Sequence, residues 1–392
     1  MKLLFYRYGS IIEPDVIDGF KELGFTVLEE TTEITNKDLT PQQGIKNVGQ
    51  FLDSHPVEFV FSVNFYPFLS EVCRIYRLPY LCWTVDSPVM ELFSSSIKND
   101  TNRIFLFDRT TYDELSPYNP DCIFHLPLAV NTKERDKVIS GASQKQREKF
   151  SHPLAFVGSL YTEKNPYQRL KAKGTYLEGY LNAIQEAQLK VYGYYFIEQT
   201  LTEQITQEFL KHFEGFYRLP GDNFLTDRYT LANLYIGSNI SVMERDRICR
   251  LLSPKYPFYL YTASDTKAYP ALHNCGLAKS LTEMPIIFHE SKINLNITSK
   301  PIRSALPLRI WDILSAGGFC LTNYQSELGE ELVIGEHLAC YTSLEELDAL
   351  VAYYLEHEKE RQEIAANGYE YVRTHCTYPL RLTKMLELAF HL

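Results

Sequence analysis

The sequence has little concentrated positive charge. Its 392 residues include 39 Lys and Arg against 49 Asp and Glu, so the formal net charge is −10, and no run of Lys or Arg stands out. Non-specific binding of nucleic acid needs a basic face that neutralises phosphates. The composition therefore argues against a nucleic-acid partner.

Long hydrophobic runs are also missing. Residues 1–7 are too briefly apolar for a signal peptide, and no run approaches the ~20 apolar residues of a membrane span. We therefore expect a protein without a membrane span that resides in the cytoplasm.

Paired cysteines are absent as well. The eight cysteines are scattered without a Cys-x-x-Cys pair, and several lie within apolar runs, as Cys82 does. Such a distribution favours free, buried thiols in a reducing compartment over a disulfide framework or a zinc site.

What the first half does contain is an alternation of strand and helix patterns. Apolar runs predict strands, and periodic segments between them predict helices. A Gly-x-Gly-x-x-Gly fingerprint does not follow the first run. The alternation predicts an α/β fold with a mostly parallel sheet covered by helices. The expected strands are residues 3–6, 25–28, 58–63, 80–84, 103–107 and 122–126, and two of the helices are 42–54 and 67–77.

A chain of 392 residues is too long for one ordinary core, so we expect two domains. The first spans residues 1–131, and the polar segment 132–150 is the expected linker. The second spans 151–377, and 378–392 forms a final helix. Expected strands of the second domain are 154–157, 258–261, 286–288, 319–322 and 338–341, with helices at 176–187 and 202–213 and within 225–252.

Ligands of parallel sheets bind beyond the carboxyl ends of the strands. Gly158 and Ser159 follow such a strand, and glycine lets backbone N–H groups approach a phosphate, although for a lone glycine an ordinary tight turn is the favoured explanation. Lys292, Asn294 and Asn296 alternate with apolar residues. That alternation indicates either a polar wall of a site or a half-buried strand with one solvated face.

Residues 300–319 are the most informative stretch. Arg303 precedes a helix whose first turn suits Pro307, and the N-terminus of a helix favours a diphosphate. Arg309 and Asp312 share one face of that helix. Arg309 could bind a phosphate and Asp312 the ribose hydroxyls. Alternatively, the two side chains form an ion pair with each other at the surface, which would contribute little energy. Gly317 and Gly318 then close the helix.

In the first domain, Asp86 follows a predicted strand. Its carboxylate is a candidate general base for an acceptor hydroxyl or a ligand of an acceptor sugar, and capping of the next helix is an equal alternative. Asp108 is a weaker candidate of the same kind. The pair Glu244 and Arg245 could reach the site, but we favour a charged helix face for it.

Several of these segments together resemble glycosyltransferases of the GT-B fold. The likeness is to the bacterial spore-maturation-type (CgeB-like) group, and residues 83–88 and 105–109 look like the uncharacterised domain that often precedes it. The resemblance implies two Rossmann-like domains facing a cleft, a final helix that returns to the first domain, and no obligatory metal or other cofactor. The matching segments are 292–296, 308–319, 345–347, 353–355, 361, 365–368 and 375–378.

The expected function is therefore transfer of a sugar from a nucleotide-diphosphate sugar, such as a UDP-sugar, to a hydroxyl acceptor on protein, glycan or a lipid-linked molecule. Related enzymes carry a Glu-x7-Glu motif; Asp312 takes its second position, and the first is not acidic here. Donor sugar and stereochemistry thus stay open, and a catalytically silent nucleotide- or sugar-binding module is the alternative. Asp86 is the expected catalytic residue, and the expected donor-binding residues are Gly158, Ser159, Lys292, Asn294, Asn296, Arg303, Arg309, Asp312, Gly317 and Gly318.

Overall fold

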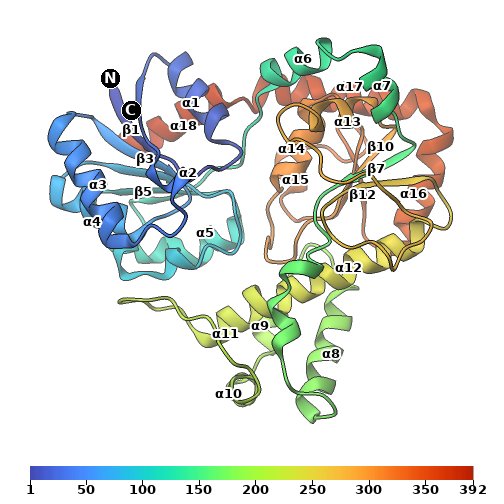
Figure 1. Ribbon diagram of the computed structural model, residues 1–392, viewed down its shortest axis with the longest axis horizontal. Coiled ribbons are helices and arrows are strands. Elements are labelled where there is room, and N and C mark those ends of the chain that lie inside the picture. Colours follow the sequence, from blue (N-terminus) through green and yellow to red (C-terminus); the bar gives the residue numbers. More distant parts are fainter. Residues whose placement is uncertain (392) are drawn as a thin grey trace. The chain divides into compact units, whose positions relative to one another are not determined.

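The computed structural model of the protein describes residues 1–391 and divides the chain into two compact units (Figure 1). Unit 1 comprises Met1–Val130, Leu219–Leu225 and the chain from Cys376 onward. Unit 2 comprises Asn131–Arg218 and Thr226–His375. The chain thus passes from one unit to the other four times.

Within the described residues, unit 1 is built on a six-stranded parallel sheet of order β2-β1-β3-β4-β5-β6. Its central strands are buried on both faces, which is why they read as continuous apolar runs in the sequence. The strands are β1 (Lys2–Tyr6), β2 (Thr26–Glu30), β3 (Phe59–Val63), β4 (Tyr80–Trp83), β5 (Asn102–Leu106) and β6 (Ile123–His125).

Helices cover the sheet of unit 1. The final helix α18 packs against α1, where a Cβ on Gly19 would lie 2.8 Å from Leu382. Helix α3 begins with a capping box of Thr40 and Gln43 and packs against α4. The helices are α1 (Glu13–Glu22), α2 (Thr32–Thr35), α3 (Pro41–Ser54), α4 (Pro67–Tyr76), η1 (Met90–Phe93), η2 (Ser95–Lys98), α5 (Arg109–Leu115), η3 (Ser116–Tyr118) and α18 (Tyr378–Phe390).

Unit 2 contains a second parallel sheet, which in the described residues has six strands of order β12-β11-β10-β7-β8-β9. Its core includes Phe156, Leu260, Leu295 and Leu321. The strands are β7 (Leu154–Val157), β8 (Phe258–Tyr261), β9 (His273–Asn274), β10 (Ile293–Asn296), β11 (Cys320–Asn323) and β12 (Ala339–Tyr341). The two parallel sheets with their helices confirm the expected α/β class.

Eight helices accompany this sheet in the described part of unit 2. Two of them, α6 and α7, pack against α13 and occupy residues 132–150, so this segment is structured and does not form the expected linker. These helices are α6 (Thr132–Ser140), α7 (Gln144–Phe150), α12 (Gly237–Leu252), α13 (Met284–Glu290), α14 (Leu308–Ser315), α15 (Leu328–Glu331), α16 (Leu344–Glu356) and α17 (Glu358–His375).

Two further expectations for unit 2 were wrong. Residues 286–288 form part of α13, a helix with Pro285 in its first turn, because a short apolar run has no period that separates a buried strand from a buried helix. Strand β10 has no solvated face, since Asn294 and Asn296 are 0% and 2% exposed. Its polar side chains are inside the protein.

The connection between β7 and β8 carries a helical subdomain, which we define as η4 through η6. It encloses its own apolar core around Leu181, Phe209 and Tyr235 and is coloured green to yellow in Figure 1. Its elements are η4 (Thr162–Lys164), η5 (Pro166–Arg169), α8 (Tyr176–Gln188), α9 (Ile197–Thr200), α10 (Glu203–Lys211), α11 (Asp227–Thr230) and the π-helix η6 (Leu231–Ile236), which runs into α12.

The eight cysteines all lie in described residues and are all free, as the sequence predicted. Only Cys275 among them is exposed. Among residues 1–391, no helix combines the length and the hydrophobicity that a membrane crossing needs.

Candidate functional site

Each sheet has a point where the order of its strands reverses. In unit 1 this point lies between β1 and β3, and in unit 2 it lies between β7 and β10. Because successive connections leave in opposite directions there, the loops at the carboxyl ends of the two strands separate and leave a crevice, which is where open α/β sheets bind ligands. Both crevices contain unusual polar side chains.

The guanidinium group of Arg245 spans the crevice of unit 2. It donates one hydrogen bond to the carbonyl oxygen of Ser159, after β7, and another of 2.7 Å to that of Ile297, after β10. The group also lies over the ring of Tyr161, 4.1 Å from its centroid. Arg245 therefore ties together the two loops that form the crevice.

Arg245 carries a buried charge that no carboxylate neutralises. The residue is 5% exposed, its Nε has no hydrogen-bond partner, and no Asp or Glu in the described residues forms an ion pair with it. Burying an ion is costly unless it is paired. The crevice therefore offers a positive charge to an incoming anion.

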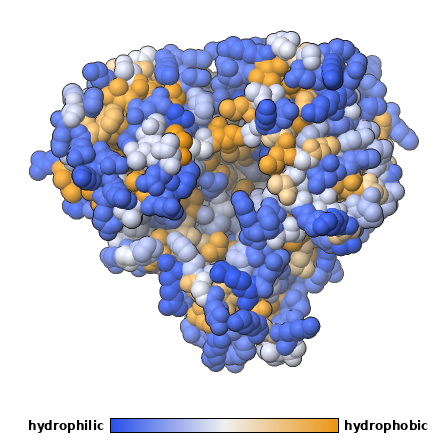
Figure 2. Space-filling model, viewed as in Figure 1, coloured by the Kyte–Doolittle hydropathy of each residue, from blue (hydrophilic) through white to orange (hydrophobic). Residues whose placement is uncertain are grey.

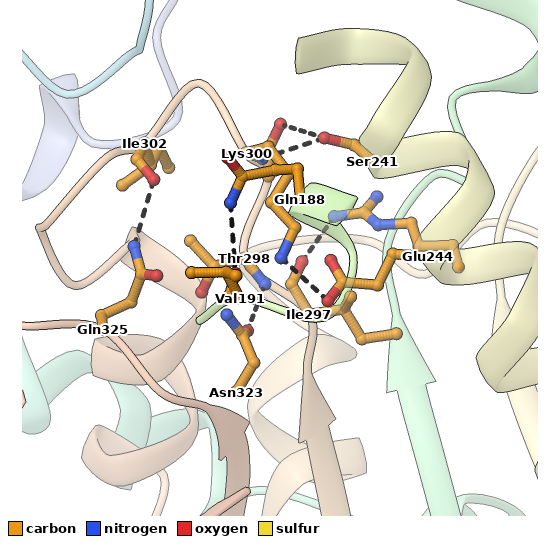
Figure 3. Close-up of polar contacts among 12 residues, drawn as sticks. Gln188, Val191, Ser241, Glu244, Ile297, Thr298, Lys300, Ile302, Asn323 and Gln325 are labelled. Atoms are coloured by element: carbon orange, nitrogen blue, oxygen red, sulfur yellow. Dashed lines mark hydrogen bonds and ion pairs between the residues drawn. The ribbon is translucent and has the colours of Figure 1, made fainter. Parts of the chain in front are cut away.

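Arg245 shares a buried polar face of α12 with Ser241 and Glu244. Figure 3 shows the latter two holding the loop after β10. Ser241 Oγ accepts a 2.9 Å hydrogen bond from the N–H of Lys300, and the Lys300 ammonium lies 3.0 Å from Glu244. These two charged side chains are 9% and 1% exposed. The buried ion pair fixes the start of the stretch 300–319 against the helix.

The loop after β11 holds the same segment from the other side. The side chain of Asn323 accepts a 2.7 Å hydrogen bond from the N–H of Thr298, and Gln325 donates to the carbonyl of Ile302 (Figure 3). Further along, Ser304 donates a 2.6 Å hydrogen bond to Glu327. The loop after β10 is thus fixed by side chains from two neighbouring elements.

Arg309 and Asp312 pair with each other at 3.0 Å, and each side chain is 24% exposed. The expected alternative of an ion pair is therefore what the structure shows, although the pair is partly buried. Burial lowers the pKa of Arg309 and raises that of Asp312. Tyr161 and Arg245 are close enough to influence the pKa of Arg309 as well, which places Arg309 near the crevice.

The helix that carries this pair has an open N-terminus. Pro307 is the N-cap residue of α14, one position before the expected first turn, and it forms no capping hydrogen bond through a side chain. The first N–H groups of a helix have no partners within the helix. Together with the helix dipole they add to the positive potential near Arg309.

Four expected donor-binding residues lie at the opposite, amino edge of the sheet. Lys292 is exposed and precedes β10. Asn294 is fully buried and donates hydrogen bonds to the carbonyls of Phe288 and Phe319, so its role is structural. Because a strand separates these positions from the crevice, the structure does not support them as donor ligands.

Gly317 and Gly318, the other two residues at that edge, end α14 before β11. Gly317 adopts a φ of +69°, and the N–H groups of both glycines bond back to Leu314 and Ile313, which is a Schellman motif. A Cβ on Gly318 would lie 2.5 Å from the carbonyl oxygen of Phe288. Helix termination and close packing explain this pair.

The remaining expected residues lie at or beyond the carboxyl ends of the strands. Gly158 and Ser159 follow β7, and the Ser159 hydroxyl donates a 2.8 Å hydrogen bond to Glu163. Asn296 is buried at the end of β10, where its amide donates to the hydroxyls of Thr298 and Thr322. Arg303 lies in the loop after β10 and faces the ring of Tyr229 at 5.7 Å.

The crevice of unit 1 contains Asp86. This exposed carboxylate accepts a 2.7 Å hydrogen bond from the amide of Asn64 and a 3.4 Å bond from the Tyr8 hydroxyl. Burial and the charge of Asp86 raise the pKa of Tyr8, so its hydroxyl keeps the proton that it donates. The three residues follow β4, β3 and β1, which are adjacent in the sheet.

Asn64 is held in a strained conformation. Its φ is +60°, in the left-handed region, and its side-chain oxygen accepts a 3.0 Å hydrogen bond from the N–H of Val85. Its amide also donates to Tyr8 at 3.1 Å. Backbone strain of this kind concentrates at functional sites, and here it directs one amide toward Asp86.

Helix capping, the alternative role for both aspartates, applies to Asp108 and not to Asp86. The helix after Asp86 is η1, whose N-cap residue is Val89 without a side-chain bond, so Asp86 does not cap it. Asp108 is 2% exposed and caps α5 through a 2.9 Å bond from the N–H of Thr111. Only Asp86 remains as a candidate carboxylate.

The sequence interpretation missed the role of α12, although a signal was present. Ser241, Glu244 and Arg245 recur at the same helical spacing as Ile248, Cys249 and Leu252, which are fully buried. A face continuous with apolar residues predicts burial of its polar members. Among residues 1–391, no group of three or more His, Cys, Asp or Glu is arranged to hold a metal ion.

Comparisons with known proteins agree with this architecture. Residues 245–387, beginning at Arg245, match a family model described as glycosyl transferase-like. None of the curated proteins matches the chain.

Several solved structures resemble the whole chain. The Anabaena protein Alr3699/HepE in complex with UDP-glucose gives a TM-score of 0.55 at 10% identity, over 100% of both chains. A glycosyltransferase from Rickettsia africae gives 0.54 at 11%, over 100% of this chain and 98% of that one. Sucrose-phosphate synthase from Thermosynechococcus elongatus gives 0.56 at 9%, over 99% and 98%. The chain therefore has the GT-B glycosyltransferase fold, and residues 245–387 match a glycosyl transferase-like family.

Proposed function

We propose that the protein is a glycosyltransferase that moves a sugar from a nucleoside-diphosphate sugar to a hydroxyl acceptor. The observation that carries the proposal is the buried, unneutralised guanidinium of Arg245 at the crevice of unit 2. A diphosphate is the anion that this chemistry suits, because it brings negative charge to a site rich in arginine and open N–H groups. The Anabaena relative, solved with UDP-glucose, supports a UDP-sugar as donor.

In this proposal the crevice holds the donor by its diphosphate. The backbone at Gly158 and Ser159 approaches the phosphates, Arg309 and the N-terminus of α14 add positive charge, and Asp312 takes the ribose hydroxyls. Donor binding then exchanges part of the Arg309–Asp312 pair for ligand contacts. Positive groups that are already in place stabilise charge on the departing diphosphate, so we propose transfer without an obligatory metal.

Asp86 is the proposed group on the acceptor side. An ionised carboxylate can accept the proton that an acceptor hydroxyl loses as its oxygen bonds to the sugar. Tyr8 and Asn64 keep this carboxylate oriented without supplying a counter-charge. The closer likeness to the spore-maturation-type group, with its N-terminal domain, and a cytoplasmic location belong to the same proposal.

The test is a thermal-shift panel of UDP, UDP-glucose, GDP and ADP, because a ligand of the native state raises the melting temperature. We expect stabilisation by a nucleoside diphosphate and its sugar, followed by hydrolysis or transfer that persists in EDTA. Arg309→Ala should weaken nucleotide binding. The proposal fails if no nucleotide stabilises the protein, whereas tight binding without turnover on any acceptor indicates a silent binding module.

A further inference from the structure

The helical subdomain contains a pocket outside the crevice described above. It lies between the first turns of α8 and α10 and has a volume of about 520 Å³. This volume falls within the range of ~300–1,000 Å³ that is typical of small-molecule sites. The pocket is lined by Thr175, Tyr176, Leu177, Tyr180, Thr202, Gln204, Ile205 and Glu208.

One wall of the pocket presents aromatic rings. Tyr176 is 80% exposed, and the ring of Tyr180 lies 6.3 Å from it, centroid to centroid. An aromatic ring so exposed contributes little to the core of the subdomain. It provides instead a flat surface with a polar hydroxyl tip, on which the C–H face of a pyranose ring can pack. The face of the helical subdomain seen at the bottom of Figure 2 mixes hydrophilic with hydrophobic residues.

The pocket also offers hydrogen-bond donors and acceptors. The threonines that cap the two helices bond to the N–H groups of Glu178 and Ile205, which leaves the earlier first-turn N–H groups without partners inside the helices. Gln204 is exposed, and its amide can both donate and accept. Hydroxyl groups of a sugar need both kinds of partner.

The lining of the pocket offers no positive charge to an anion. The carboxylate of Glu208 lines the pocket and is fixed by Lys211 at 2.9 Å and His212 at 3.2 Å. Hydrogen bonds from Lys211 and His212 are the largest cause that lowers the pKa of Glu208. None of the lining residues is basic, so a nucleoside diphosphate would find no positive group in the lining, whereas a neutral sugar gains an acceptor.

We propose that this pocket binds a neutral oligosaccharide. Every lining residue precedes residues 245–387, so the pocket is separate from the segment that matches the glycosyl transferase-like family. The binding does not rest on the proposed function. If the proposed function also holds, this binding indicates that the acceptor is a glycan. An extended oligosaccharide could be held in this pocket while its end reacts at the transfer site.

The test is a microarray of neutral and acidic oligosaccharides probed with the full-length protein. Tyr176→Ala is the test variant, and Tyr194→Ala is the matched control, because Tyr194 is 55% exposed in the same subdomain but does not line the pocket. We expect binding of neutral glycans that falls roughly fivefold or more in Tyr176→Ala and is unchanged in Tyr194→Ala. Gln204→Ala should weaken binding as well.

Three results would overturn the proposal: no neutral glycan bound by the wild type, equal binding by Tyr176→Ala, or a preference for acidic glycans. Since Tyr176 is so exposed, loss of folding is not an expected cause of any change, and melting temperatures check this. UDP affinity, measured on the same samples, should be equal in all variants. It separates failure of this site from failure of the proposed donor site.

Discussion

The two sheets differ in strand order but are built alike around the point of reversal, where they place opposite charges. Both are parallel, and both reverse direction beside their first strand. Unit 1 presents an exposed carboxylate, Asp86, held by an amide and a hydroxyl. Unit 2 encloses a guanidinium, Arg245, held by two carbonyl groups. The scaffold therefore fixes where a site forms, and the side chains placed beside each point of reversal decide its chemistry.

The largest expected effect is that of removing the negative charge in unit 1. Asp86→Asn should lower kcat by about 10²–10⁴-fold, the usual contribution of a general base, while UDP affinity stays unchanged. Asp108→Asn is the contrast, because Asp108 is a helix cap and Asn caps a helix about as well as Asp; it should change stability by less than about 1 kcal/mol and spare kcat. Steady-state kinetics and nucleotide titration check both. A kcat for Asp86→Asn near that of the wild type would remove Asp86 from the mechanism.

Removing the positive charge in unit 2 should act on binding. Arg245→Met retains much of the side-chain volume but leaves two buried carbonyl groups without their donor, so we expect UDP affinity to fall about 10- to 100-fold and stability to fall by roughly 2–4 kcal/mol. Arg250→Met, an exposed position on the same helix paired with Asp246, is the control. Calorimetric titration and chemical denaturation measure the two quantities. Unchanged UDP affinity would contradict the proposed role of Arg245.

A second comparison is between the two edges of the unit 2 sheet. The crevice lies at the carboxyl edge, and Gly318 lies at the amino edge. Gly318→Ala forces a Cβ to 2.5 Å from a carbonyl oxygen and should lower the free energy of unfolding by about 2 kcal/mol or more. The UDP affinity of the folded protein should not change. Gly329→Ala, where nothing lies within 4 Å, should be neutral within ~0.5 kcal/mol. Loss of UDP affinity without loss of stability would return Gly318 to the donor site.

Positioning of the carboxylate should contribute less than the carboxylate itself. Asn64→Gly removes the amide that orients Asp86, while glycine adopts the positive φ of this position without steric strain. We expect kcat to fall roughly tenfold with an unchanged KM for the donor. The melting temperature should fall, because the N–H of Val85 loses its acceptor and glycine makes the unfolded chain more flexible. Equal kcat in the two proteins would show that Asp86 needs no such support.

The smallest expected effect is a pH dependence at the amino edge of unit 2. His152 stacks on Tyr259 at 3.9 Å and its Nε2 lies 2.7 Å from the Tyr261 hydroxyl. Burial, with a lesser effect of His273, lowers the pKa of His152 from 6.5 to about 4. Between these values the unfolded chain binds the extra proton, so stability is full above pH 6.5 and declines as the pH falls toward 4.

From pH 7 to pH 5 this residue should cost roughly 1–2 kcal/mol of stability. Denaturation of the wild type and of His152→Gln across this range measures the difference in slope, since the variant lacks the titrating group. Parallel stability profiles would show that His152 is not responsible.

The sequence predicted the strands of unit 1 well, because segments such as Phe59–Val63 are buried on both faces and lie between clear helical patterns. It wrongly predicted a strand at 286–288, because a short, fully buried run lacks the periodicity that distinguishes a helix from a strand. It also predicted a linker at 132–150, where the polar composition gave no sign of the two helices. The sequence named Asp86 and Arg309 as candidates by their place after a strand or on a helix, and both stay predictions. It favoured a charged helix face for Arg245 and did not name Asn64, because their partners at Ile297 and Asp86 are distant in sequence.

The short segment Leu219–Leu225 has a consequence for engineering. Although it interrupts the helical subdomain in sequence, it belongs to unit 1, where Phe224 stacks on Tyr118 at 4.3 Å and Asn223 pairs with Ser94. A chimera made with a single crossover near residue 130 would inherit this segment from the wrong parent. Exchange of unit 1 between relatives therefore requires its three segments to be exchanged together. A chimera made at one junction is expected to contain a unit 1 whose segments come from two parents and pack poorly.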